Sequence, residues 1–135
     1  MDDRRSYQRF PVHLDVKLKK FEGTSVEMDG EVIDVSFRGL GIIVSEELQP
    51  GTEVSVEWPD PPFYFAGDAV VRGTVVSIQR DKGESGPFRL GVKFSDPDSE
   101  LAQCLLNWVQ MEASMQKRAQ SVANRFSSKQ KRIKF

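Results

Sequence analysis

The stretch Val12-His13-Leu14-Asp15-Val16-Lys17-Leu18-Lys19 alternates apolar and polar residues along its whole length. A period of two is typical of a β-strand that buries one face and leaves the other in water. The same alternation returns twice later in the chain, in Val54, Val56 and Trp58, and in Phe88, Leu90, Val92 and Phe94. We therefore expect half-buried strands at these three places.

Three further β-prone runs lie between them, over Glu31 to Val35, Leu40 to Val44 and Ala66 to Ile78. Gly73 interrupts the last run and predicts a bulge or bend there. Turn residues separate the runs, as in Glu22 to Ser25 and Asp81 to Gly86. Six antiparallel strands with short links favour closure into a small barrel, because closure removes exposed edges. The sequence thus predicts an all-β fold with a six-stranded antiparallel barrel.

One C-terminal α-helix is expected after the strands. Asp96 is the predicted N-cap, followed by Pro97 at the first helical position and by acidic residues that complement the helix dipole. An apolar stripe on this helix is expected to pack on the barrel, and it comprises Leu101, Cys104, Leu105, Trp108, Met111 and Met115. The helical pattern fades beyond Met115.

The net charge of −1 conceals three segments of different charge. Residues 1–20 carry six Lys or Arg and three Asp or Glu, residues 21–116 carry six and seventeen, and residues 117–135 carry seven and none. The middle is therefore acidic and both ends are basic. We expect an N-terminal arm over 1–11, a barrel with its closing helix over 12–116, and a basic, flexible tail over 117–135.

Composition argues against several chemistries. A single histidine, His13, and a single cysteine, Cys104, cannot form a zinc cluster within one chain, so no metal site is expected. Ser36 has no evident histidine partner, and no GxxxxGK[ST] loop is present, so we expect no enzyme. No apolar run is long enough to cross a membrane, and the N-terminus lacks a secretory h-region. A cytoplasmic location is expected.

Two short motifs carry the strongest functional signal. Arg5 and Arg9 form RxxxR ahead of the first strand. The guanidinium fork pairs with phosphate and also matches the O6/N7 edge of guanine. Taken alone, the pair could equally be ordinary surface charge on a frayed terminus.

The second motif is DxSxxG, formed by Asp34, Ser36 and Gly39 at a strand turn. The strand period places Asp34 and Ser36 on the outer face and Ile33 and Val35 toward the core. A carboxylate can accept from the N1–H and amine of guanine, with a hydroxyl beside it. The alternative is a turn in which Asp and Ser bond their own backbone.

The two motifs together, followed by the alternating first strand and by Leu90-Gly91-Val92-Lys93-Phe94, resemble the PilZ domain family of bacterial cyclic di-GMP receptors. The resemblance covers about residues 4–112 and implies a six-stranded barrel with the ligand on its outer face. It implies that Arg5 and Arg9 take the phosphates and the guanine O6/N7 edge, while Asp34 and Ser36 take the donor edge. Gly39 would allow close approach.

Further positions follow from the same resemblance. Arg4 precedes the arginine motif. In similar proteins the residue at this position influences whether one ligand or a stacked pair binds. Arg38 and Gly91 would be contacts at the rim of the site. The implied function is a non-enzymatic receptor without a cofactor, whose arm rearranges on binding cyclic di-GMP and is read by a partner protein in motility, exopolysaccharide or a related output.

Two alternatives compete with this hypothesis. One is a PilZ-like interaction module that acts without nucleotide, although such relatives generally lack the motif residues. The other is a nucleic-acid binder that uses the basic tail. The acidic body and the lack of interleaved aromatic and basic residues count against the second.

Overall fold

The computed structural model describes residues 7–20, 27–80 and 86–133, with side chains as far as residue 123. Within these ranges the strands are β1 (Phe10–Lys20), β2 (Met28–Val35), β3 (Gly39–Val44), β4 (Glu53–Glu57), β5 (Val70–Arg80) and β6 (Phe88–Phe94), followed by helix α1 (Glu100–Ile133). The expected turn over 22–25 and most of the loop over 81–86 lie outside the described residues.

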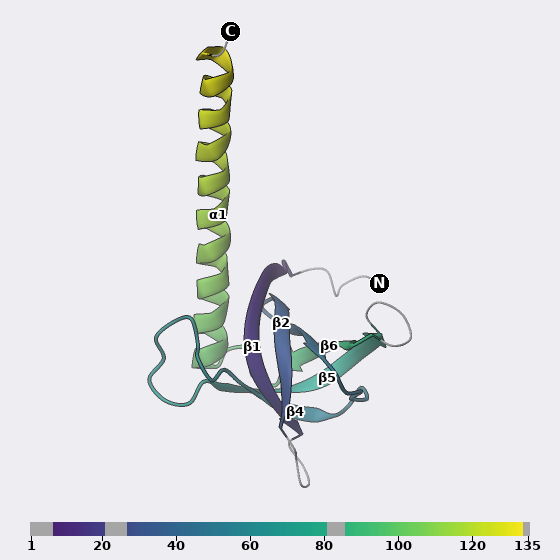
Figure 1. Cartoon of the computed structure of the whole chain (residues 1–135). Helices are drawn as coiled ribbons and strands as arrows, with labels where there is room; N and C mark the ends of the chain where they lie inside the picture. Colours follow the sequence, from purple (N-terminus) through teal and green to yellow (C-terminus); the bar gives the residue numbers. More distant parts are fainter. Residues whose placement is uncertain (1–6, 21–26, 81–85, 134–135) are drawn as a thin grey trace.

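All strand pairs are antiparallel, and the strands close into a barrel in the order β1-β2-β3-β6-β5-β4. The all-β, six-stranded barrel with a C-terminal helix is thereby confirmed (Figure 1). Alternate residues of each strand fill the interior, among them Leu18, Val56 and Leu90, which are fully buried. Burying each such side chain contributes about 1.5–3 kcal/mol, so the alternation itself drives closure.

Two of the register shifts between paired strands lie in the part of the outer surface that forms the candidate site. One lies between Val32 and Asp34 in β2, so Ile33 is an extra residue and only half-buried. The other lies between Val75 and Ser77 in β5 and turns Val76 outward. The bulge predicted at Gly73 was therefore misplaced. Gly73 instead allows close contact, because a Cβ there would meet the Lys93 carbonyl oxygen at 2.6 Å.

Ser99 caps helix α1, and the prediction of Asp96 was wrong. The Ser99 hydroxyl accepts a hydrogen bond from the Ala102 amide at 3.3 Å. Asp96 instead closes the preceding turn, where its carboxylate accepts from the Asp98 amide at 3.1 Å. Both residues are good caps, but only Ser99 lies three residues before an amide that needs an acceptor.

The first half of α1 packs on the barrel through Leu101, Ala102, Leu105 and Val109, all buried. The predicted stripe was correct for Leu101, Leu105 and Trp108, the last of which packs partly buried against the core, but wrong for the two methionines. Met111 and Met115 are 58% and 56% exposed, and Cys104 is only half-buried. The barrel is shorter than the helix, so residues beyond Val109 lose contact with it.

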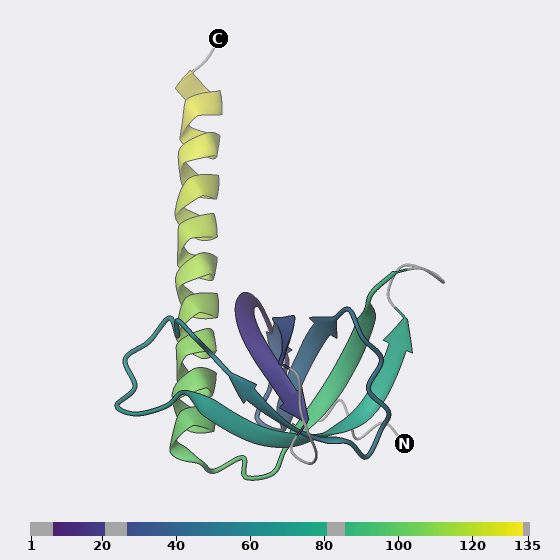
Figure 2. The ribbon, with the colours of Figure 1, turned by 60° about the horizontal axis from the view of Figure 1, so that its bottom comes forward.

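The helix also continues far past Met115, to Ile133. No Gly or Pro interrupts residues 100–133, so nothing in the local sequence stops it. Figures 1 and 2 show its second half standing clear of the barrel. A flexible tail over 117–135 stays a prediction. Within the part of the chain that the structure describes, no helix is long and apolar enough to span a membrane.

Candidate functional site

A groove of about 670 Å³ runs over the outer surface of the barrel, across the four neighbouring strands β2, β3, β6 and β5. It is bordered by the segment before β1 and by the turn between β2 and β3. Its polar lining consists of Tyr7, Arg9, Asp34, Ser36, Arg38, Ser77, Gln79, Arg89 and Lys93.

The centre of this groove is a row of four residues in register across the sheet. Asp34 of β2 is paired with Gly41 of β3, Gly41 with Gly91 of β6, and Gly91 with Ser77 of β5. The two middle positions carry no side chain. The row therefore forms a floor without side chains of its own, with Gly41 buried and Gly91 half-buried between a carboxylate and a hydroxyl.

The end residues of the row lean over this floor. A Cβ placed on Gly41 would meet the Asp34 carboxylate oxygen at 2.8 Å, and one on Gly91 would collide with the Ser77 hydroxyl. Neither glycine has a positive φ. Their value here is the missing side chain, which lets the Asp34 carboxylate and the Ser77 hydroxyl lie close over the strand backbone.

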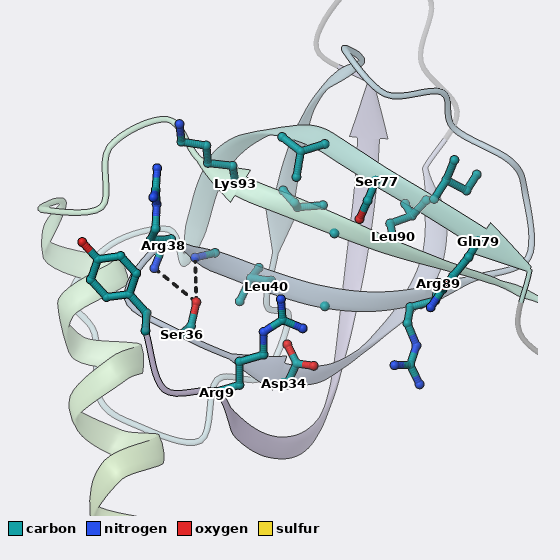
Figure 3. Close-up of a pocket in the computed structure, with 17 residues that line it drawn as sticks. Arg9, Asp34, Ser36, Arg38, Leu40, Ser77, Gln79, Arg89, Leu90 and Lys93 are labelled. Carbon is teal, nitrogen blue, oxygen red and sulfur yellow. Dashed lines mark hydrogen bonds between the residues drawn. The ribbon is translucent and has the colours of Figure 1, made fainter. Parts of the chain in front are cut away.

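Cations dominate the groove. Arg9, Arg38, Arg89 and Lys93 line it against one carboxylate, Asp34. Figure 3 shows the Arg9 side chain beside Asp34, Arg38 and Lys93 toward one end, and Arg89 toward the other. Because residues 21–116 carry seventeen acidic and only six basic residues, this local excess of cations distinguishes the groove from its surroundings. Such a concave, positively charged surface attracts anions.

Ser36 is not exposed on the outer face, contrary to what the strand period predicted. It is buried, with 9% exposure, and its hydroxyl accepts hydrogen bonds from the amides of Arg38 and Gly39 at 3.2 and 3.3 Å (Figure 3). The turn begins at this residue, since the Ser36 amide donates to the Gly39 carbonyl at 2.9 Å. The period of two therefore ends at Val35, and the side-chain-to-backbone alternative is correct for Ser36.

The presence of glycine at position 39 also has a structural reason. A Cβ at this position would overlap the backbone carbonyl of Val92 on β6. Its pairing partner there is Lys93, and the Phe94 amide donates to the Arg38 carbonyl at 2.9 Å. Gly39 thus allows β3 to approach β6 at the point where the turn enters the sheet.

The segment before β1 is held at the rim by aromatic contacts. The rings of Tyr7 and Phe37 lie 5.4 Å apart, and the Arg38 guanidinium lies 5.6 Å from the centre of the Tyr7 ring. Ring pairs and cation–π contacts of this kind contribute about 0.5–1.5 kcal/mol each. Residue 7 is therefore attached to the β2–β3 turn at the edge of the groove.

The groove brings together most of the site residues expected from the sequence. Arg9, Asp34, Ser36, Arg38, Gly39 and Gly91 all line it, whereas Arg4 and Arg5 lie outside the described residues. Sequence reasoning missed Tyr7, Gly41, Ser77, Arg89 and Lys93. The sequence contained two signals for these residues. Gly39 and Gly41 are alternate residues of one strand, and Arg89, Gly91 and Lys93 are alternate residues of another. Their meeting depends on strand order, which these patterns do not contain.

No cluster of three or more metal-ligating side chains occurs among residues 7–20, 27–80 and 86–133. Asp34 is the only acidic residue among those lining the groove in this part of the chain. The described groove thus offers guanidinium, ammonium, hydroxyl and backbone groups to a ligand, with one carboxylate as acceptor.

Comparison with known proteins assigns this architecture to a family. The family model described as PilZ domain matches residues 3–111. The PilZ domain of YcgR from Escherichia coli, solved with cyclic di-GMP, superposes with a TM-score of 0.62 at 18% identity, covering 90% of this chain and 98% of that one. No curated protein matches the sequence.

Two longer proteins contain the same fold. The inhibitor of motility MotI/DgrA of Bacillus subtilis gives a TM-score of 0.61 at 19% identity, and the match covers 82% of this chain and 51% of that one. YcgR of Escherichia coli in complex with cyclic di-GMP gives 0.58 at 19% identity, covering 91% of this chain and 50% of that one. This chain thus spans about half the length of these two proteins.

Proposed function

This chain belongs to the PilZ domain family, and we propose that it is a receptor for cyclic di-GMP, bound in the groove over β2, β3, β6 and β5. The observation that carries the proposal is the row Asp34, Gly41, Gly91, Ser77, with Arg9 beside its acidic end. This row combines a flat floor, an acceptor for guanine and a donor for phosphate.

The size and charge of the groove suit this ligand. Its volume of about 670 Å³ falls within the usual range for small-molecule sites, roughly 300–1,000 Å³. Cyclic di-GMP carries two phosphodiester charges, and four cationic side chains line the groove. Charge-assisted hydrogen bonds from guanidinium to phosphate are the strong, directional kind. The structure of the YcgR PilZ domain with cyclic di-GMP supports the choice of ligand.

Guanine recognition is assigned to Asp34 and the arginine motif. The Asp34 carboxylate accepts from the N1–H and amine of guanine, which adenine cannot offer in the same arrangement. Arg9, with Arg5 on the preceding chain, donates to the O6/N7 edge and to the phosphates. Ser36 and Gly39 support the site by fixing the turn next to Asp34.

The glycine floor gives the bases a surface to lie on. Gly41 and Gly91 carry no side chain, so only the movable ends of Asp34 and Ser77 lie over the backbone there, and Val76 adds an apolar wall. Val76 is 54% exposed because the bulge in β5 turns it outward, and a base packed against it would remove apolar surface from water. Arg38 and Lys93 provide charge at one end.

Signalling is assigned to the N-terminal arm that precedes β1. Tyr7, in this arm, lies against Phe37 at the rim of the groove. Ordering the arm over the ligand costs conformational entropy, which the phosphate contacts offset. The surface that the arm covers differs between the free and bound states, and a partner protein that prefers one state receives the signal. This role requires no catalytic step.

Isothermal titration calorimetry with cyclic di-GMP, cyclic di-AMP and GTP tests the proposal. We expect binding heat with cyclic di-GMP and at least about tenfold weaker affinity for the others, a difference of about 1.4 kcal/mol. Asp34→Asn should reduce this selectivity, while Asp68→Asn, an exposed aspartate outside the groove, should leave it unchanged. Absence of binding heat with the intact protein would refute the receptor and leave the nucleotide-independent module as the function.

A further inference from the structure

The second half of α1 presents an apolar surface that the barrel does not cover. Met111, Met115 and Val122 are 58%, 56% and 49% exposed, and Figures 1 and 2 show this part of the helix clear of every strand. Helices in proteins owe most of their stability to the packing of such a face. A free helix of this length with an exposed apolar stripe indicates that another surface packs on it.

The spacing of the stripe is that of a coiled coil. Beyond the residues that pack on the barrel, steps of three and four residues define one face of the helix, with positions Glu112, Met115, Ala119, Val122, Phe126, Lys129 and Ile133. A repeat of seven residues with apolar residues at these two positions is the pattern that packs helix against helix. Only Glu112 and Lys129 depart from it, and they carry opposite charges.

We propose that this face pairs with the same face of a second copy of the chain, in antiparallel orientation. An antiparallel pair centred between Ala119 and Val122 gives three kinds of layer beyond the part of the helix that packs on the barrel, each occurring twice: Ala119 with Val122, Met115 with Phe126, and Glu112 with Lys129. The two polar positions then meet each other, and the apolar positions meet only apolar partners. The register follows from the sequence positions alone.

The orientation follows from charge. A parallel pair would place Glu112 against Glu112 and Lys129 against Lys129 inside the seam, and would set two +7 tails side by side. The antiparallel pair replaces both like-charge layers by ion pairs. It also brings residues 117–135 of each copy toward the acidic 21–116 segment of the other. One pair of like charges, Arg118 and Arg125, comes close in this arrangement. It lies at flanking positions, where water screens the repulsion.

The barrel does not obstruct this pairing. Leu105 and Val109, which face the barrel, lie roughly a third of a turn around the helix from Met115 and Val122 at 3.6 residues per turn. Each barrel sits at the start of its own helix, so the two barrels lie at opposite ends of the antiparallel pair. The overlapping segment, residues 112–129, begins after the residues that pack on the barrel and is free of Gly and Pro.

Sedimentation equilibrium of the full chain tests the proposal. We expect a dimer for the unaltered protein. Val122→Glu places a carboxylate at the centre of the seam and should raise the dissociation constant by at least about 100-fold. Ser121→Glu adds the same charge on the opposite side of the helix and should leave the dimer intact. A monomer throughout, or equal effects of the two substitutions, would overturn the proposal.

Charge reversal tests the orientation with variants that leave the barrel unchanged. Glu112→Lys and Lys129→Glu should each weaken the dimer about tenfold, because each breaks two ion pairs in the antiparallel seam. Combining them should restore the affinity. In a parallel seam each single change only exchanges one like-charge layer for another. Single variants that match the unaltered protein would therefore overturn the antiparallel register, and circular dichroism confirms that all variants stay folded.

Discussion

The groove and the second half of α1 are opposite kinds of surface. In the groove, side chains are missing at Gly41 and Gly91, and the backbone beneath is rigidly paired on both sides. On the helix, side chains such as Met115 and Val122 are present, and no described part of the barrel covers them. The groove has a fixed shape that suits a flat ligand, whereas the helix has exposed apolar groups that suit a packing partner.

The difference shows how the same fold separates two tasks. Four strands hold the groove in place, so changes there affect ligand affinity and, where backbones approach, stability. Residues 114–123 of α1 are exposed and lie outside the groove lining, so changes there should affect the proposed association and not the ligand affinity. Breaking either region should leave the other intact, and the predictions below are ordered by the size of the expected effect.

Gly39→Ala should destabilise the fold by about 3 kcal/mol or more, because its Cβ would overlap the Val92 carbonyl and backbones cannot easily move apart. Gly41→Ala is the matched control. Its Cβ would meet only the carboxylate of Asp34, the end of a side chain that can rotate away. Urea unfolding should show a large loss for the first variant and less than about 1 kcal/mol for the second. Equal losses would contradict the distinction.

Arg9→Ala should lower the affinity for cyclic di-GMP about 100-fold, since two charge-assisted hydrogen bonds of about 1.5–3 kcal/mol are lost in part. Arg118→Ala, an exposed arginine on the free half of α1, is the matched control and should change the affinity less than twofold. Calorimetric titration of both variants measures the effect. Similar losses in both would mean that general positive charge, not the groove, attracts the ligand.

Gly91→Ala should lower the affinity for cyclic di-GMP about tenfold by filling the floor between Asp34 and Ser77. The Ser77 hydroxyl can move away from the new methyl group, so the unfolding free energy should change far less than in Gly39→Ala. Titration and urea unfolding of the same sample separate the two effects. Unchanged affinity would place the bases elsewhere on the barrel.

Val122→Glu should leave the affinity for cyclic di-GMP within twofold of the unaltered protein, although it disrupts the proposed pairing of α1. The residue lies on the exposed face of a helix segment that contributes nothing to the groove. Titration at protein concentrations above and below the dimer dissociation constant provides the check. A larger change would show that self-association and ligand binding are coupled.

Local patterns were sufficient for much of this molecule. Alternation in β1, β4 and β6 predicted strands that the structure confirms, and the two arginine and aspartate motifs led to a groove that contains Arg9 and Asp34. These features depend on neighbouring residues in the chain. The sequence therefore carried both the fold class and the location of the candidate site.

Non-local features were harder to predict. The row from Asp34 to Ser77 depends on the pairing of β3 with β6 and on the bulge at Val76, which no single strand reveals. Ser36 was expected to be exposed, but it is buried with its hydroxyl bonded to the turn, because the strand ends one residue before it. The end of α1 was misjudged because the helical pattern was judged to fade beyond Met115, although no Gly or Pro stops the helix there.

The central claim is that cyclic di-GMP lies on the glycine floor. A titration followed by ¹H–¹⁵N correlation spectra tests it most directly, because glycine amides report on their own backbone. We expect the resonances of Gly41 and Gly91 to shift and saturate together with those of Ser77 and Asp34, while Ser55 on β4, outside the groove lining, stays unchanged. Saturating ligand that leaves both glycine resonances in place, or shifts only those of β1 and β4, would contradict the account.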